Sequence, residues 1–144
     1  MEERSDAGMG RCHCAALRKA ARRVSQFYDE KLSSTGLRAS QYGILVTIRD
    51  KGELSVGELA GRLELDRTTT GKNLRPLERV DYIRVALSKT DGRSRRITLT
   101  ARGLAALNAA APLWREAQSE FEANNGLEKT VALRATLANL RINA

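Results

Sequence analysis

Aromatic residues, cysteine and histidine are scarce in this chain of 144 residues. Aromatics make up 4% of it, so the core has to be built from leucine, valine, isoleucine and alanine, and such a light core often leans on a partner chain. The two cysteines, Cys12 and Cys14, are too few and too close together for a disulfide framework. With His13 as the single histidine they do not complete a tetrahedral metal set. We therefore expect neither a metal nor a cofactor.

The sequence also lacks the signatures of membrane proteins and of enzymes. No apolar run approaches the roughly 18 residues that a membrane span needs. Residues 1–10 are polar and acidic, unlike a signal peptide, so we expect them to be disordered and the protein to be cytoplasmic. There is no phosphate-binding glycine loop and no nucleophile elbow. We predict that the protein is not an enzyme.

Positive charge is what the chain has in excess. Lysine and arginine number 25 against 17 acidic residues, which gives a net charge of +8 and a pI near 10.1. The excess is concentrated, because eleven basic and five acidic residues lie between Arg62 and Arg102. Such a basic stretch is typical of a protein that binds a polyanion such as nucleic acid. The alternative is a solvated basic surface with no ligand.

Hydrophobic periodicity predicts a mainly helical chain with a small β-hairpin. Apolar residues recur every three or four positions over most of the chain, and every second position after Tyr82. Glycines that can end helices follow at Gly36, Gly52 and Gly126. The expected helices cover residues 11–33, 39–51, 55–63, 66–79, 101–123 and 127–140, and the expected strands cover residues 83–88 and 96–100.

The two short helices in the middle of the chain are almost contiguous, and the hairpin follows them. Ser55 and Glu58 form a capping-box pattern before the first helix, and Asp66 can cap the second. Pro76 removes a backbone donor inside the second helix, but the apolar face continues beyond it, so we predict one kinked helix. Helix, turn, helix and basic hairpin in this order predict a winged helix-turn-helix, a DNA-binding fold.

Long apolar stripes at both ends of the chain predict a homodimer. A heptad-like seam runs along the long helix that follows the hairpin, and the first and last helices have stripes with no other obvious cover. We expect residues 11–144 to form a single domain. Residues 11–35 and 104–142 would form the dimer, and residues 37–102 the DNA-binding lobe. The seam consists of Leu104, Leu107, Ala111, Trp114, Gln118 and Phe121.

The hairpin also resembles a known family. The sequence DGRSRRITLTARG, from Asp91 to Gly103, is similar to the wing of the MarR family of multiple-antibiotic-resistance-type regulators, and the resemblance extends from Cys12 to Leu140. It implies a homodimeric transcriptional regulator, most often a repressor, whose first and last helices interlock. Each subunit would place its fourth helix in a major groove of an inverted-repeat operator and its wing in the adjacent minor groove. Small-molecule effectors of the family bind between the dimer helices and the DNA-binding lobe.

The resemblance also assigns roles to individual residues. Arg93 would enter the minor groove, and Asp91 would hold the wing tip in shape. Threonine, asparagine, lysine and arginine side chains suit contacts with phosphates and base edges. The residues expected to face double-stranded DNA are Arg67, Thr68, Thr69, Thr70, Lys72, Asn73, Arg93, Arg95 and Arg96. Two rival functions are a non-specific architectural DNA binder and an interaction protein with an acidic partner.

Two positions near the N-terminus resemble those of peroxide-sensing MarR proteins. Cys14 lies where these relatives have a reactive cysteine, and Tyr28 where they have a tyrosine that hydrogen-bonds it from the partner subunit. The second tyrosine of these relatives is replaced here by Ala39. Cys12 is a candidate resolving thiol, although the two cysteines of one helix would point to different faces. The alternatives are that a small ligand is the signal and that Cys14 is only a small apolar residue at the dimer seam.

Overall fold

The computed structural model describes residues 8–90, 92 and 94–143 of the chain. It confirms the predicted fold class, because the described part is mostly helical with a small antiparallel sheet. The elements follow in the order η1 (Met9–Arg11), α2 (His13–Leu32), η2 (Ser33–Thr35), α3 (Ala39–Lys51), β1 (Glu53–Ser55), α4 (Val56–Leu63), α5 (Arg67–Arg79), β2 (Ile83–Leu87), β3 (Arg95–Leu99), α6 (Ala101–Asn125) and α7 (Leu127–Ala138).

The helix ends lie close to their predicted positions. Gly36 and Gly52 have φ angles of 75° and 76°, which residues other than glycine rarely adopt, and they end η2 and α3. Pro76 lies inside α5, which is continuous from end to end. The predicted disorder of residues 1–10 falls mostly outside the described residues. A short 3-10 helix covers Met9–Arg11, and the disorder of the N-terminus stays a prediction.

The sheet contains one strand that the sequence did not predict. Its order is β1-β3-β2, with both pairs antiparallel, so β3 is the central strand. Leu54 of β1 pairs with Ile97 of β3, and both side chains are fully buried. The wing is therefore not a free hairpin, because β1 fixes the base of β3 to the segment that leads into α4.

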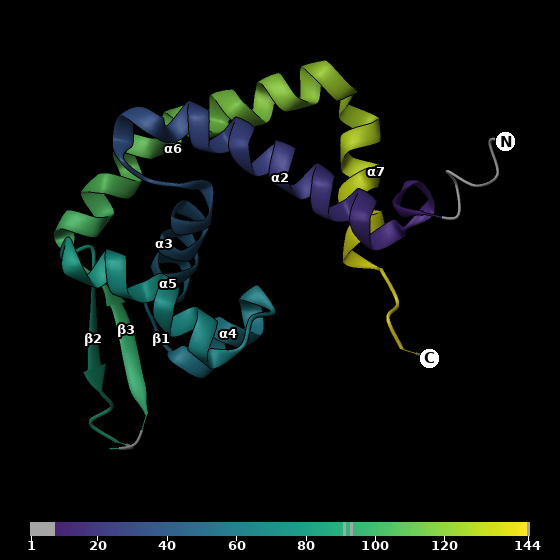
Figure 1. Ribbon diagram of the computed structural model, residues 1–144. Helices are drawn as coiled ribbons and strands as arrows, with labels where there is room; N and C mark the ends of the chain where they lie inside the picture. The colour runs from purple at the N-terminus through teal and green to yellow at the C-terminus, as the bar shows by residue number, and fades with distance from the viewer. Residues whose placement is uncertain (1–7, 91, 93, 144) are drawn as a thin grey trace, which may run out of the picture.

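Figure 1 shows two parts, a lobe that contains α3, α4, α5 and the sheet, and an arch formed by α2, α6 and α7. The core lies mainly in the lobe, where leucine and isoleucine side chains of α3, α4, α5, the strands and the start of α6 are buried together. None of the helices in the described part of the chain is long and apolar enough to cross a membrane.

Helix α6 joins the two parts of the molecule. Its first half packs on the lobe through Leu107 and Ala110, which are fully buried, and its second half runs beside α2 (Figure 1). The indole of Trp114 stacks on the ring of Tyr42 in α3, with 5.7 Å between the centroids. Part of the seam is therefore buried within the chain itself, whereas Leu104 remains 41% exposed. Trp114, predicted to need a partner for its burial, packs against its own chain.

A short junction attaches the start of α6 to the base of the wing. The hydroxyl of Thr100 accepts a hydrogen bond from the Gly103 amide (2.9 Å) and donates one to the carbonyl of Asp81 (2.6 Å). The Thr100 amide donates to the carbonyl of Tyr82 (3.1 Å). Gly103 is buried against Tyr82, so α6 begins in direct contact with the segment that connects α5 to β2.

Candidate nucleic-acid interface

Helices α4 and α5 form a compact pair. The hydroxyl of Ser55 accepts a hydrogen bond from the Glu58 amide at 3.0 Å, which confirms Ser55 as the N-cap of α4. The turn after α4 is tight because Glu64 has a left-handed backbone (φ 53°) and the Leu65 amide donates to the carbonyl of Ala60. α5 therefore starts only a few residues after α4 ends, as the predicted helix-turn-helix requires.

Asp66 caps α5 as predicted. Its carboxylate accepts hydrogen bonds from both the amide (2.7 Å) and the hydroxyl (2.8 Å) of Thr69. These bonds stabilise the ionised form and lower the pKa of Asp66, with the bond from the Thr69 amide as the largest cause. The hydroxyl of Thr69 thus has a structural partner at the start of the helix.

The outer face of α5 holds most of the residues that the sequence assigned to DNA. Arg67, Thr68 and Lys72 are exposed, and Asn73 is half-buried. Thr70 is a correction, because its side chain is 0% exposed and its hydroxyl donates to the carbonyl of Asp66 at 2.8 Å. It lies on the inner face of the helix and is not available to a ligand in this structure.

The wing carries basic residues along its strands and towards its tip. Arg84, Lys89 and Arg95 are exposed, and the Ser88 amide donates to the carbonyl of Ser94 (2.7 Å) where the two strands separate. The two wing residues with roles implied by the family resemblance, Asp91 and Arg93, lie outside the described residues.

Arg96, also assigned to the interface by the sequence, has two acidic partners within the protein, and its contact with DNA stays a prediction. Its guanidinium lies 3.5 Å from the carboxylate of Glu53 in β1 and 3.2 Å from that of Glu58 in α4. Glu58, expected to complete a capping box, instead pairs with Arg96. Arg96 thus links β3 to β1 and α4, and in this structure its charge is used within the protein.

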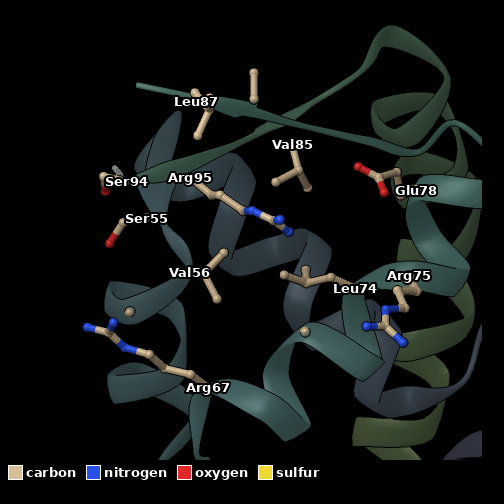
Figure 2. Close-up of a pocket in the computed structure, with 13 residues that line it drawn as sticks. Ser55, Val56, Arg67, Leu74, Arg75, Glu78, Val85, Leu87, Ser94 and Arg95 are labelled. Carbon is tan, nitrogen blue, oxygen red and sulfur yellow. The ribbon is translucent and has the colours of Figure 1, made fainter. Parts of the chain in front are cut away.

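An open cleft of about 670 Å³ separates α5 from the wing. Figure 2 shows Arg95 extending from β3 across this cleft, with Arg67 and Arg75 of α5 at opposite ends. The sequence analysis did not assign Arg75 to the interface, although its spacing provided a signal. Arg67, Gly71 and Arg75 are four residues apart and therefore lie on one face of α5.

The predicted redox residues are separate from this interface. Cys12 precedes α2, and its sulfur accepts a hydrogen bond from the Ala15 amide (3.4 Å), whereas Cys14 is exposed in the first turn. The hydroxyl of Tyr28 is hydrogen-bonded to Gln118 of α6, and burial, followed by the charge of Glu122, raises the pKa of Tyr28. The described part of the chain contains no group of three His, Cys, Asp or Glu side chains placed to hold a metal.

The arrangement of the lobe defines a class of protein. A capped helix presents polar and basic side chains on its outer face, a second helix braces it, and a basic β-hairpin projects beside it (Figure 1). A helix of this kind fits the major groove of DNA, and its neighbouring wing reaches the adjacent groove. The lobe is a winged helix-turn-helix, the fold of many DNA-binding transcriptional regulators.

Comparison with known proteins identifies the family. Residues 37–94 match the sequence profile of the MarR family. The structure of the Mycobacterium tuberculosis transcriptional regulator MosR in complex with DNA is 37% identical, with a TM-score of 0.75, over 90% of this chain and 99% of MosR. SarZ, an HTH-type transcriptional regulator of Staphylococcus epidermidis, is 28% identical over 88% of this chain and 84% of SarZ. The chain belongs to the MarR family.

A third comparison supports the fold alone. A mutant of MarR from Escherichia coli, solved with operator DNA, is 20% identical, with a TM-score of 0.78, over 85% of this chain and 89% of that one. Membership of the MarR family makes the chain a DNA-binding transcription factor and not an enzyme, as the sequence predicted.

Proposed function

We propose that the protein is a sequence-specific repressor that binds an inverted-repeat operator as a homodimer. The main support is the outer face of α5, where Arg67, Thr68 and Lys72 are exposed on a helix whose start is fixed by the Asp66 cap. Lysine and arginine supply contacts with phosphates, and threonine and arginine also read base edges. The similar protein MosR has been solved in complex with DNA, which favours the same ligand here.

The proposed dimer rests on the apolar surface that the arch leaves uncovered. α7 has no buried residue, and its exposed large side chains include Leu127 (60% exposed), Val131, Leu133 and Leu137 (43%). Leu17, on the first half of α2, is also 43% exposed. Water-exposed apolar area of this extent on neighbouring helices is typical of an interface. We assign residues 11–35 and 104–142 to dimerisation and residues 37–102 to DNA binding.

The oligomeric state is testable without DNA. Sedimentation equilibrium at micromolar concentration is expected to give twice the mass of 15.9 kDa, the mass of one chain. A folded protein that remains at the mass of one chain at these concentrations would contradict the proposed dimer.

The operator itself can be recovered from genomic fragments that the purified protein retains. We expect an inverted repeat with half-site centres about one helical turn apart. Arg93→Ala should weaken operator binding by roughly 1–3 kcal/mol, with a loss that depends on the A·T content of the flanks. Equal affinity for operator and random DNA at every salt concentration would instead favour an architectural protein. No DNA binding at moderate salt would favour an interaction protein with an acidic partner.

We further propose that the signal is either a small ligand or oxidation of Cys14. Cys14 is exposed at the start of α2, within the part of the helix assigned to the dimer. A hydrogen bond to Tyr28 of the same chain is excluded by distance, because fourteen helical residues span about 21 Å. In the redox mechanism, a peroxide converts the Cys14 thiolate to a sulfenic acid, and Cys12 displaces water from it to form a disulfide. Within one chain, that bond requires the first turn of α2 to unwind, because Cys12 caps the helix; the alternative is that the partner chain supplies the cysteine.

Oxidation is tested on the protein–DNA complex. Mild peroxide should release the operator, and a reductant should restore binding. Cys14→Ser is expected to bind normally and to ignore peroxide. If a variant that lacks both thiols is still released, or if the wild-type protein never is, the signal is a small ligand. Since the ligand of a repressor is chromosomal DNA, we place the protein in the cytoplasm.

A further inference from the structure

The predicted DNA contacts include Arg67 and Arg95, but they do not say which part of the DNA lies in the cleft between α5 and the wing. We propose that it seats the sugar-phosphate backbone of one DNA strand, and that Arg75 holds a phosphate there together with Arg95. The proposal rests on the proposed function. It adds the path of the backbone between the two reading elements and a residue, Arg75, that fixes this path.

The charge around the cleft suits a phosphodiester chain. Arg67, Arg75 and Arg95 come from two elements and face a single carboxylate on the lining, that of Glu78. Figure 2 shows the three guanidinium groups spread along the cleft, with that of Arg95 in its middle. Within the described residues none of the three arginines forms an ion pair, in contrast to Arg96 on the same strand as Arg95. Their charges are free for a ligand with repeated negative groups.

The shape of the cleft also fits the backbone. Gly71 provides the room, because a Cβ atom added to it would meet no atom within 4 Å. Apolar side chains of α4, α5 and β2 line the cleft between the arginines, and they suit the carbon faces of deoxyribose, which carry no charge. Ser55 and Ser94 also line the cleft. The apolar lining consists of Val56, Leu74, Val85 and Leu87.

The position of the cleft follows from how a winged helix binds DNA. When α5 lies in the major groove and the wing in the adjacent minor groove, the strand that separates the two grooves has to pass between them. In this chain the space between α5 and the wing is the cleft. Phosphate contacts position a protein on the duplex and carry no sequence information, so Arg75 and Arg95 are expected to fix the register in which α5 reads the bases.

The salt dependence of binding tests the two arginines. Arg75→Ala and Arg95→Ala should each weaken binding to operator and to random duplex by the same factor, roughly ten-fold. Each should reduce the slope of log K against log salt by about 0.9, the value for one lost phosphate contact. The matched control is Arg115→Ala, which removes the same charge from α6 outside the cleft lining. Arg115 lies in the segment assigned to the dimer, so sedimentation first has to show that this variant keeps the wild-type mass, and its slope should then be unchanged. Thermal unfolding confirms that each variant is folded.

A charge-preserving variant tests the cleft itself. Gly71→Leu fills the space and keeps all three arginines, and we expect it to weaken binding to both duplexes and to lower the slope. If wild-type protein prefers its operator over random DNA but Arg75→Ala behaves like Arg115→Ala, or Gly71→Leu binds like wild type, the backbone does not lie in the cleft. If wild-type protein shows no preference for any operator, the proposed function fails, and the slopes of the variants on random duplex still decide whether the cleft holds phosphate.

Discussion

Replacing Gly103 with alanine tests the junction between α6 and the wing. A Cβ atom on Gly103 would lie 2.0 Å from the carbonyl oxygen of Tyr82 and 2.9 Å from a methyl group of Leu99, whereas ordinary contacts are 3.4–4 Å. The oxygen belongs to the backbone and cannot rotate away, so the start of α6 has to move by about an ångström or more to remove the overlap. Alanine favours a helix over glycine by about 1 kcal/mol, and overpacking against a fixed group costs more than this. Overpacking costs up to about 3 kcal/mol, so we expect a net loss of about 2 kcal/mol.

Urea denaturation followed by circular dichroism measures the effect at one fixed protein concentration, because association adds to the apparent stability. A loss of about 2 kcal/mol corresponds to a fall of about 7 °C in the melting temperature of a domain of this size. Gly61→Ala is the matched control, since Gly61 lies in α4 and an added Cβ would meet nothing within 4 Å. The control should gain up to about 1 kcal/mol. A Gly103→Ala variant as stable as wild type would refute the close approach of α6 to Tyr82.

Three further predictions concern assembly, wing position and pH. Leu137→Asp should leave the winged lobe folded but shift the mass in sedimentation towards one chain, because it places a charge on the exposed apolar face of α7; an unchanged mass would contradict the assigned interface. Arg96→Ala should weaken operator binding with no change in the salt slope. It should change the free energy of unfolding by less than about 1 kcal/mol, since the partners of Arg96 are carboxylates near the surface. A salt slope lowered like that of a phosphate contact would show that Arg96 contacts DNA. The pKa of Asp66 is lower in the folded protein than its ordinary value of 3.8. The ionised carboxylate therefore stabilises the folded protein above that value, and this stabilisation is lost as the pH falls through the folded-state pKa. Asp66→Asn should therefore reduce the loss of stability on acidification below about pH 4, seen in urea titrations at several pH values, and an unchanged acid limb would contradict this role for the cap.

Periodicity was enough to place the helices and the wing, because an amphipathic helix and an alternating strand carry their own signals. Strand β1 carries none. It is three residues long, and it exists because Leu54 is buried opposite Ile97, a partner more than forty residues away. Long-range pairing of this kind is decided by packing and leaves no periodic pattern. Without β1, no sequence pattern placed Glu53 beside Arg96.

The residue types of the interface were easier to predict than the directions in which they point. Thr70 has the chemistry of a DNA contact, but it lies four residues before Leu74 and seven before Leu77, so it belongs to the buried face of α5. That spacing was visible in the sequence and outweighs residue type. Trp114 illustrates the opposite case, because its stacking on Tyr42 depends on how α6 crosses α3, which no local pattern specifies.

The bare apolar face of α7 has a consequence for gene dosage. Under the proposed dimer, DNA is bound by pairs of chains, and chains that are not paired expose this face to water. While most chains are single, the number of pairs rises with the square of the number of chains, so halving the amount of protein lowers the number of pairs about fourfold. Promoter occupancy would then respond to protein abundance more steeply than for a regulator that works as one chain, and a modest change in synthesis or proteolysis would itself act as a signal.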